Sequence, residues 1–200
     1  MVVYYTIPGM NPIELITPAL ASHGEGTIYR TKDPALVAKI FHVHDPWRIR
    51  KLEVMIAHPP VDPMARRGHV SFAWPKHLLS ESSGKPAGYL MPFIRGSQTL
   101  QNVYIPKLRQ RRATGVNWGH LHRVAQNIVS ILDAIHAMGY VIGDIKDDNF
   151  LAGIRMLVSI IDTDSFQITD SRGGSVFRCP VGTIEFTPPE LIGMRFTDLS

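Results

Sequence analysis

The chain has 200 residues, of which 44% are hydrophobic and 19% are charged, and its formal net charge is +4. This length allows one domain with a sizeable core or two small lobes, and the composition is ordinary for a folded globular chain. The mild positive charge suits an anionic ligand but does not demand nucleic acid.

Neither a disulfide framework nor a membrane span is expected. The single cysteine, Cys179, excludes an internal disulfide and is compatible with a reducing cytosol. The N-terminus lacks a basic region followed by an apolar core, and no apolar run approaches the length of a transmembrane helix. We therefore expect a cytoplasmic protein, without a nucleic-acid partner and without a membrane segment in this chain.

The first half of the chain is predicted to be rich in strands. Alternating and β-branched apolar residues indicate strands, and clusters of Gly, Pro, Asn, Asp and Ser indicate the turns between them. Strands are expected over residues 13–15, 27–30, 36–41, 69–79 and 86–94, with turns over residues 20–26, 33–34 and 81–85.

One helix interrupts these strands. Asp45 and Pro46 form a typical N-cap and first turn. An apolar stripe follows, and the run His58-Pro59-Pro60 should end the helix. The residues of the stripe are Leu52, Met55 and Ile56.

The second half is predicted to be mainly helical. The basic run 107–112 is typical of a solvated helix face, and an acidic partner is the alternative. Asn117 should cap a long helix that ends near Met138, before Gly139. Residues 173–174, two glycines, indicate a mobile loop. The apolar face of the long helix comprises Val124, Ile128, Ile131, Leu132 and Ile135.

Residues 140–164 contain two acidic centres. Asp144 can accept or orient a hydroxyl proton, Lys146 can neutralise a transferring phosphoryl group, and Asn149 can offer an oxygen to Mg²⁺. Asp162 follows an apolar run, where a carboxylate is either a strand cap or a metal ligand. The alternative for the first centre is a solvated polar turn, but the apolar residues around it argue for burial.

Two features of the first half could assist this chemistry. Lys39 lies in an apolar strand and needs a partner, for which Glu53 is the nearest candidate. A lysine at a strand edge that reaches into water is the alternative. Gly24 and Gly26 could let backbone amides approach phosphate oxygens, although two glycines in a turn are more often part of a simple hairpin.

In chain order, these features resemble a protein kinase domain. The order is a glycine loop, a strand lysine, a helix glutamate, the D-x-K-x-x-N motif at Asp144, a strand-ending aspartate at Asp162, and a G-T…P-P-E segment. The resemblance covers residues 13–200 and is closest to a divergent bacterial Ser/Thr-type kinase. It implies an α+β fold of two lobes. An antiparallel-sheet N-lobe with one helix would span residues 1–94, and an incomplete, mainly helical C-lobe residues 95–200.

The resemblance also implies roles for individual residues. Lys39 would hold the α- and β-phosphates of ATP, Asp144 would be the catalytic base, and Lys146 would lie near the γ-phosphate. Asn149 and Asp162 would hold Mg²⁺, and Thr183 and Glu190 would match the substrate-side loop and the P-P-E glutamate. The remaining residues implied to contact the nucleotide are Ala21, His23, Gly24, Gly26, Ile28, Val37, Glu53, Met91, Pro92, Phe93, Ile94 and Leu151.

The chain departs from the family pattern at four places. Ala21 and His23 replace the first two glycines of the phosphate loop, and Ile142-Gly143 replaces the His-Arg pair before the catalytic aspartate. Thr163 and Asp164 replace the Phe and Gly of the metal-binding triplet. Without that arginine, a phosphorylated activation loop loses its usual docking charge. We therefore expect activity that is independent of activation-loop phosphorylation.

The family has several helices after the P-P-E segment, whereas only residues 191–200 follow it here. The resemblance therefore implies an incomplete lobe whose apolar surface is covered by a partner or by a second copy. The leading prediction is an ATP- and Mg²⁺-dependent kinase acting on Ser or Thr of a protein. The alternatives are a pseudokinase that binds nucleotide as a scaffold, and a small-molecule kinase of the aminoglycoside or choline type.

Overall fold

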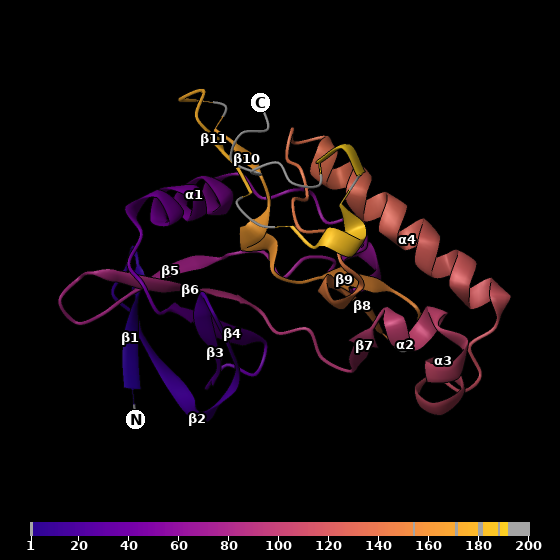
Figure 1. Cartoon of the computed structure of the whole chain (residues 1–200). Coiled ribbons are helices and arrows are strands. Elements are labelled where there is room, and N and C mark those ends of the chain that lie inside the picture. The colour runs from indigo at the N-terminus through magenta and orange to yellow at the C-terminus, as the bar shows by residue number, and fades with distance from the viewer. Residues whose placement is uncertain (1, 154, 171, 180–181, 188, 192–200) are drawn as a thin grey trace. The chain divides into compact units, whose positions relative to one another are not determined.

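The computed structural model of the chain describes residues 2–153, 155–170, 172–179, 182–187 and 189–191 (Figure 1). The chain divides into two compact units. The first comprises Met1–Pro59 and Trp74–Phe93, and the second comprises Pro60–Ala73 and Ile94–Ser200. The segment Pro60–Ala73 therefore packs with the second half of the chain, although it precedes the last strands of the first unit.

The first unit is built around a closed, antiparallel barrel of six strands (Figure 1). Closure leaves no free sheet edge, because β1 pairs with both β2 and β5. The strands, in the spatial order β1-β2-β3-β4-β6-β5, are β1 (Val2–Ile7), β2 (Pro12–His23), β3 (Gly26–Thr31), β4 (Leu36–Phe41), β5 (His77–Ser80) and β6 (Pro86–Pro92).

The barrel interior is apolar. Its buried core is extended by half-buried aromatic and aliphatic residues from neighbouring strands. Because side chains alternate along a strand, Ala38 faces this core while its neighbours Val37 and Lys39 face the other side of the sheet. The buried core residues are Leu15, Ala38, Leu79 and Leu90.

Most predicted strands are confirmed, with two corrections. The expected turn over residues 20–26 is shorter, because β2 continues to His23 and only Gly24 and Glu25 make the turn. The expected strand over residues 69–79 is wrong for its first part. Ser71 and Ala73 instead exchange backbone hydrogen bonds of 2.8 Å with Ile160 of the second unit, so only His77–Ser80 joins the barrel. Strand β1 was not predicted.

The helix of the first unit, α1 (Pro46–Ala57), has the predicted cap and core face. The Asp45 carboxylate accepts the Trp47 N–H at 2.9 Å, and His58 ends the helix. Leu52 and Met55 are fully buried. The capping and stripe signals in the sequence therefore identified this helix correctly.

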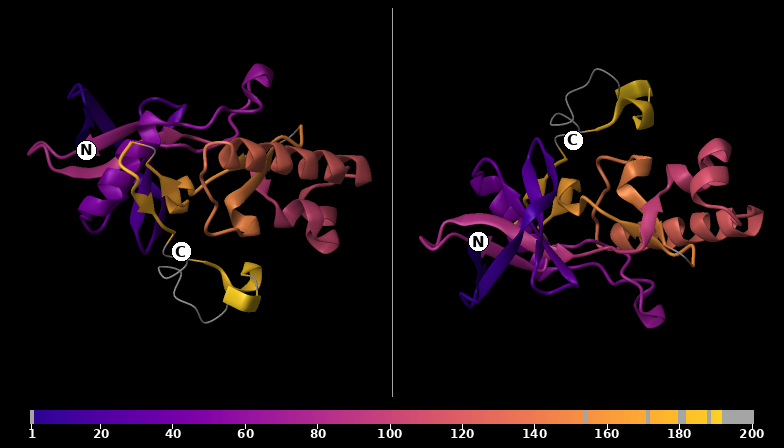
Figure 2. Two further views of the ribbon diagram at one scale, coloured as in Figure 1. Left: turned by 90° about the horizontal axis from the view of Figure 1, so that it is seen from above. Right: turned by 90° about the horizontal axis from the view of Figure 1, so that it is seen from below.

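The second unit combines helices with short sheets. Near the N-terminal end of α4, α2 and α3 lie beside it (Figure 2). The strands form the sheet β7-β8-β9 and the hairpin β10-β11. The helices are α2 (Gln101–Tyr104), α3 (Pro106–Arg112) and α4 (Trp118–His136), and the strands are β7 (Ser97–Thr99), β8 (Phe150–Gly153), β9 (Val158–Ile160), β10 (Ile168–Thr169) and β11 (Val176–Phe177).

Five short 3₁₀ helices complete the described residues. Two of them flank the acidic centres and are used below. They are η1 (Ala65–Arg67), η2 (Asp147–Asn149), η3 (Thr163–Ser165), η4 (Ile184–Phe186) and η5 (Pro189–Leu191).

The helix predictions for this unit are confirmed. Asn117 and His120 form a reciprocal capping box at the start of α4, and Gly139 adopts a left-handed φ of 70° beyond its end. None of the residues of α3 is buried, as expected for a solvated basic face. Gly174 donates its N–H to Asp170 O at 2.8 Å, so the predicted glycine loop is the turn of the β10-β11 hairpin.

Among the described helices, none combines the length and the hydropathy that crossing a bilayer requires.

Candidate active site

Asp144 is held in a loop that is fixed at both ends. Val141 and Gln167 exchange backbone hydrogen bonds of 3.0 and 2.7 Å before it, and η2 follows it. Ile142 is buried beside it, and only 6% of Asp144 is exposed. The prediction that apolar neighbours bury this acidic centre is therefore correct for Asp144, although Ile145 is 45% exposed.

Both carboxylate oxygens of Asp144 have partners. The Thr183 hydroxyl donates to Oδ1 at 2.7 Å, and the Lys146 ammonium lies 3.0 Å from Oδ2. A buried carboxylate with two such contacts is fixed in orientation, because rotation would break both. Thr183 comes from 39 residues further along the chain, so the loop and the later segment meet at this side chain.

The charges around Lys146 keep it protonated. Its pKa is raised chiefly by the hydrogen bond to Asp144, and further by the negative charges of Asp144, Asp162 and Asp148, while burial opposes the rise. The ammonium is therefore the positive centre of an acidic cluster. A cation held beside a carboxylate is well suited to balance the charge of a bound phosphate.

Asn149 and Asp162 are brought together by the backbone. The Ile161 N–H donates to Asn149 O at 2.9 Å, which places the residue before Asp162 beside the end of η2. Asp162 has a left-handed φ of 58°, and its carbonyl accepts both the N–H and the hydroxyl of Ser165, at 3.1 and 2.8 Å. The two residues predicted to hold a metal are thus neighbours although they are thirteen positions apart.

The side-chain chemistry of this pair fits a magnesium ion. The Asn149 amide donates its Nδ2–H to Asp144 O at 3.1 Å, which leaves its Oδ1 as an acceptor. An amide oxygen and a carboxylate are ligands that Mg²⁺ accepts, with phosphate oxygens and water in the remaining positions. Within the described part of the chain, no group of three or more His, Cys, Asp or Glu side chains could hold a metal alone.

The first unit places several predicted nucleotide contacts on one face of its barrel. Ile28 pairs in register with both Ala21 and Lys39, and Val37 pairs with Met91. Side chains opposite one another, or two apart on a strand, share a face. These five residues therefore lie together on the face opposite the core, and Lys39 is nevertheless only 7% exposed.

The glycine turn offers less support for a phosphate loop. His23 pairs with Gly26 at the end of the β2-β3 hairpin. A Cβ at Gly26 would lie 2.7 Å from Ile40 O, so packing against β4 already explains this glycine. A Cβ at Gly24 would meet nothing within 4 Å. The hairpin interpretation therefore accounts for both glycines without a ligand.

Three comparisons place the chain among known proteins. Protein kinase YegI of Escherichia coli O157:H7 is 35% identical over 192 residues, and the match covers 94% of this chain. Protein kinase YegI of Escherichia coli strain K12 is 35% identical over 175 residues, covering 86% of it. No protein-family model matches the chain.

Solved kinase structures share the fold. A rhoptry kinase from Toxoplasma gondii superposes with a TM-score of 0.61 at 15% identity, covering 95% of this chain and 56% of that structure. The ROP18 kinase domain, solved with AMP-PNP and sucrose, gives a TM-score of 0.59 at 17% identity, covering 94% and 60%. The chain is a divergent protein kinase domain. Its fold class is confirmed as a kinase-like α+β fold with a sheet-rich first lobe.

The chain spans about a quarter of the YegI relatives, 28% and 26% of their lengths. Part of the predicted activation segment lies outside the described residues, namely Val181, Pro188 and residues 192–200. The described part nevertheless includes Thr183 and Glu190, the two residues of that segment to which the sequence assigned roles.

The kinase domain replaces the family's arginine before the catalytic aspartate with a packed contact. Cys179 is buried, and a Cβ at Gly143 would overlap its Cβ and Sγ atoms. Residue 143 must therefore be glycine while Cys179 occupies this place. The sequence showed the missing arginine but gave no signal that Cys179 lies against Gly143.

The predicted Lys39–Glu53 pair is not supported. The Glu53 side chain is 48% exposed and pairs with Arg50 of the same helix at 3.1 Å. Lys51 is the charged residue of α1 that is buried, with 6% of its surface exposed. Lys51 lies three and four positions before Val54 and Met55, so the helical period could have placed it on the buried face.

The altered metal-binding triplet is also buried. Thr163 is fully buried and donates its hydroxyl to Ala73 O at 2.9 Å, and Asp164 is 8% exposed. A polar threonine thus fastens the end of β9 to the segment Pro60–Ala73, where the family has an apolar phenylalanine. At position 163, a hydrogen bond to Ala73 therefore takes the place of the apolar packing of the family's phenylalanine.

The sequence also missed how η2 is anchored. Asp147 accepts hydrogen bonds from Gln101 Nε2 at 2.9 Å and from the Tyr104 hydroxyl at 2.6 Å, both on α2. This hydrogen bond is the main reason why the pKa of Tyr104 is raised. Asp147 therefore anchors the loop that carries Lys146 and Asn149 to α2.

Proposed function

We propose that this kinase domain transfers the γ-phosphoryl group of ATP, bound with Mg²⁺, to a Ser or Thr hydroxyl of a protein. The observation that carries the proposal is the arrangement around Asp144. A buried carboxylate is oriented by Thr183 and Lys146, and Asn149 and Asp162 lie next to the same loop. This is the set of groups that phosphoryl transfer requires.

In the proposed reaction, the acceptor hydroxyl attacks the γ-phosphorus, a new O–P bond forms, and the bond between the γ-phosphorus and the β,γ-bridging oxygen breaks to release ADP. Asp144 orients the hydroxyl and takes its proton. Lys146, which stays protonated, compensates the negative charge of the phosphoryl oxygens. Mg²⁺, held by Asn149 and Asp162, would neutralise the phosphate oxygens and align the leaving group.

The nucleotide would use the barrel face that carries Ile28, Val37 and Lys39. Ile28, Val37 and Leu151 would contact the adenine, and Lys39 would bind the α- and β-phosphates. The rest of the proposed nucleotide contacts are Ala21, His23, Gly24, Gly26, Met91, Pro92, Phe93 and Ile94. The AMP-PNP complex of the ROP18 kinase domain supports a nucleotide ligand for this fold.

The backbone of Pro92, Phe93 and Ile94, the proposed hinge, supports their contact with the adenine. Phe93 donates its N–H to Ala35 O at 2.8 Å, so this amide is used within the first unit. Proline has no N–H at all. The adenine would therefore accept from the Ile94 amide and donate to the Pro92 carbonyl. We propose an N-lobe of residues 1–94 and a C-lobe of residues 95–200, with the segment Pro60–Ala73 packed in the second unit.

A protein acceptor is favoured over a small molecule by Thr183. This residue belongs to the segment that presents the substrate in protein kinases, and its hydroxyl reaches the proposed base at 2.7 Å. An acceptor Ser or Thr in this segment would therefore lie close to the Asp144 carboxylate, which the Thr183 hydroxyl orients. We place this activity in the cytoplasm, since the chemistry requires ATP.

A pseudokinase is the second candidate, and the exposed Glu53 favours it. Without a Lys39–Glu53 pair, Lys39 depends on other contacts for its position, and a nucleotide could bind without turnover. Retained geometry around Asp144 favours the active enzyme, because a scaffold has no need of an oriented base.

Two measurements separate the active kinase from the pseudokinase. First, thermal unfolding is followed with ATP, with and without Mg²⁺, and we expect a rise in Tm that is larger with Mg²⁺. Second, transfer of ³²P from γ-labelled ATP is compared with that of Asp144→Asn. Binding without any transfer would establish the pseudokinase, and absence of binding would overturn both functions.

A further inference from the structure

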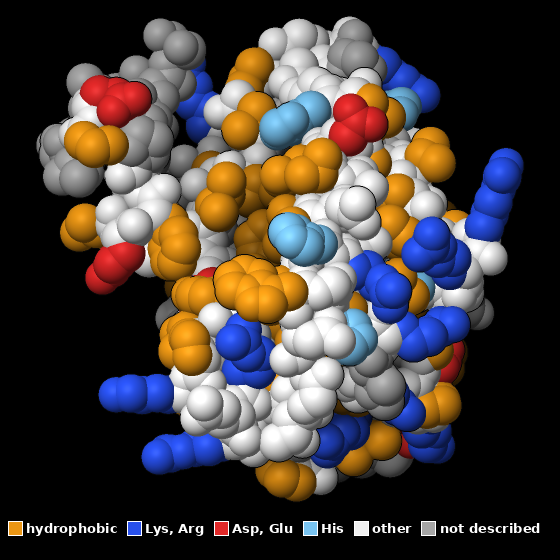
Figure 3. All heavy atoms as spheres, turned by 90° about the vertical axis from the view of Figure 1, so that its right-hand side faces the viewer, with side chains coloured by type: hydrophobic (Ala, Val, Ile, Leu, Met, Phe, Trp, Pro, Cys, Tyr) orange, Lys and Arg blue, Asp and Glu red, His pale blue; other side chains and the backbone are white. Residues whose placement is uncertain are grey.

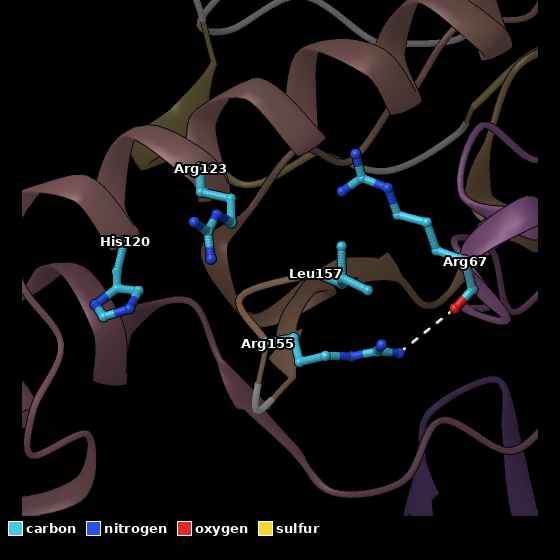
Figure 4. A pocket seen from close by; sticks show the side chains of 5 residues that line it. All are labelled: Arg67, His120, Arg123, Arg155 and Leu157. Carbon is cyan, nitrogen blue, oxygen red and sulfur yellow. Dashed lines mark hydrogen bonds between the residues drawn. The ribbon is translucent and has the colours of Figure 1, made fainter.

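A basic pocket in the second unit is not used by the proposed phosphoryl transfer. It is lined by Arg67, His120, Arg123, Arg155 and Leu157 and has a volume of about 420 Å³ (Figure 4). None of these residues belongs to the Asp144 site. Lys and Arg side chains are also spread over the face of the molecule that Figure 3 shows.

The pocket is assembled from three separate parts of the chain. Arg67 comes from η1, His120 and Arg123 from the first turns of α4, and Arg155 from the turn between β8 and β9. Arg67 and Arg123 enter from opposite sides, and Leu157 lies between them (Figure 4). Cationic groups that are distant in sequence therefore converge on one apolar floor.

Each of these parts is fixed by contacts of its own. The segment that carries Arg67 is bound to β9 through hydrogen bonds of 2.8 Å between Ser71, Ala73 and Ile160. The turn that carries Arg155 is bound to α4, because buried Asn127 donates to Met156 O at 2.8 Å. Arg155 itself donates to Arg67 O at 3.4 Å. The backbone around the pocket is thus preorganised, which lowers the entropic cost of binding.

His120 adds an oriented donor. Its Nδ1 accepts the Asn117 N–H at 3.1 Å in the capping box of α4. In the neutral imidazole this leaves the proton on Nε2, the ring nitrogen that is free of the cap. The pocket therefore offers an imidazole N–H in addition to three guanidinium groups.

The charge of the pocket is not compensated by the protein. No carboxylate lines it, and among the described residues no ion pair joins Arg67, Arg123 or Arg155 to an acidic side chain. Like charges that are held together in one concavity raise its positive potential. Guanidinium groups bind phosphate through paired, charge-assisted hydrogen bonds, and a tetrahedral dianion can accept from several directions at once.

We propose that this pocket binds a phosphate monoester. The dianion would lie over Leu157, between the guanidinium groups of Arg67, Arg123 and Arg155, with His120 donating to a remaining oxygen. A single carboxylate would leave most of the three positive charges uncompensated, so a phosphate is the better match. The proposal does not depend on the kinase reaction, since it uses none of its residues.

The test is a calorimetric titration of the chain with inorganic phosphate and with the tripeptide Gly-phosphoserine-Gly, at constant ionic strength. We expect saturable binding that Arg123→Gln and Arg155→Gln each weaken by at least about tenfold. Arg66→Gln is the matched control, because Arg66 is exposed, adjacent to Arg67 and absent from the pocket. It should change the affinity by less than about twofold.

The two ligands distinguish the sources of the phosphate. Tighter binding of the phosphoserine peptide would indicate a phosphorylated protein segment, and equal binding would indicate a free phosphate ester. Thermal unfolding of each variant, and its response to ATP, check that the fold and the Asp144 site are unchanged. Absence of saturable binding, or equal weakening by Arg66→Gln and Arg123→Gln, would overturn the proposal.

Discussion

The two units of this kinase domain differ in how closely they follow the family pattern. In the second unit, Asp144, Lys146 and Asn149 are joined to one another by contacts of 3.0 and 3.1 Å, and Thr183 completes the group. In the first unit, the expected partner of Lys39 is exposed and bound to Arg50. The comparison teaches that the predicted residues around Asp144 contact one another, whereas in the first unit Glu53 pairs with Arg50 and not with Lys39.

After Asp144, the proposed catalytic base, the largest effect on phosphotransfer is expected at Thr183. The change Thr183→Val keeps the shape of the side chain but removes the hydroxyl that donates to Asp144. A hydrogen bond to a charged group contributes about 1.5–3 kcal/mol, so phosphotransfer should fall roughly 10- to 100-fold. Initial rates measure this, with Thr183→Ser as the control that retains the hydroxyl. Full activity of Thr183→Val would show that the contact does not orient the base.

The next effect concerns the contact that replaces the family's arginine. In Gly143→Ala the new methyl group would overlap the Cys179 side chain, and we expect a loss of about 1–3 kcal/mol of stability. Gly153→Ala is the control, because its Cβ would meet only Leu157 O at an ordinary 3.5 Å. Urea unfolding measures both.

A double variant shows whether the overlap is the cause. Cys179→Gly removes the side chain that Gly143→Ala meets, so the combined loss should be smaller than the sum of the two single losses. Additive losses would mean that residue 143 is restricted for a reason other than the Cys179 side chain.

A smaller effect, a loss of stability of the fold, is expected at alkaline pH. The pKa of Lys146 is raised mainly by Asp144, and that of Tyr140 is raised by burial and then by the charge of Asp170. Both groups hold their protons more tightly when folded. The contribution of each bound proton to the stability of the fold is therefore fully present below the usual pKa of its group, about 10.4 for lysine and about 10 for tyrosine. This contribution is lost as the pH rises above those values.

Thermal unfolding at pH 8, 9.5 and 11 tests this dependence. We expect a nearly constant contribution from these groups up to pH 9.5 and a fall in Tm between pH 9.5 and 11. Tyr140→Phe keeps the ring but has no proton to lose, so its Tm should fall less over that interval. An equal fall would show that Tyr140 does not contribute.

The smallest effect is expected at Glu53. Its pair with Arg50 is exposed, and such pairs contribute about 0–1 kcal/mol to stability. Glu53→Gln should therefore change phosphotransfer by less than about twofold. Asp45→Ala, which removes the N-cap of the same helix, is a positive control for damage to α1 and should lower Tm. A large loss of activity in Glu53→Gln would restore the family's ion pair to this domain.

The sequence predicted those parts of the structure that depend on neighbouring residues. The caps at Asp45 and Asn117 and the contacts of Asp144 with Lys146 and Asn149 lie within a few positions of one another, and residues at this spacing carry their own signal. The resemblance to kinases supplied Thr183 as well. These predictions required no knowledge of which distant segments pack together.

The remaining features depend on contacts between distant segments. Residues 69–73 read as a strand of the first lobe, but their backbone pairs with Ile160. The contact of Cys179 with Gly143 and the convergence of Arg67, Arg123 and Arg155 each join segments separated by more than thirty residues. Hydrophobic period and turn chemistry do not encode such pairings, because they describe one segment at a time.

The most direct test of the account compares two carboxylates in one assay. Initial rates of γ-phosphoryl transfer are measured for the unchanged chain, Asp144→Asn and Glu53→Gln at saturating ATP and Mg²⁺. We expect Asp144→Asn to lose roughly 10²- to 10⁴-fold, as for removal of a general base, while Glu53→Gln stays within about twofold. Activity that survives Asp144→Asn but fails in Glu53→Gln would contradict the claim that the second unit holds the catalytic groups.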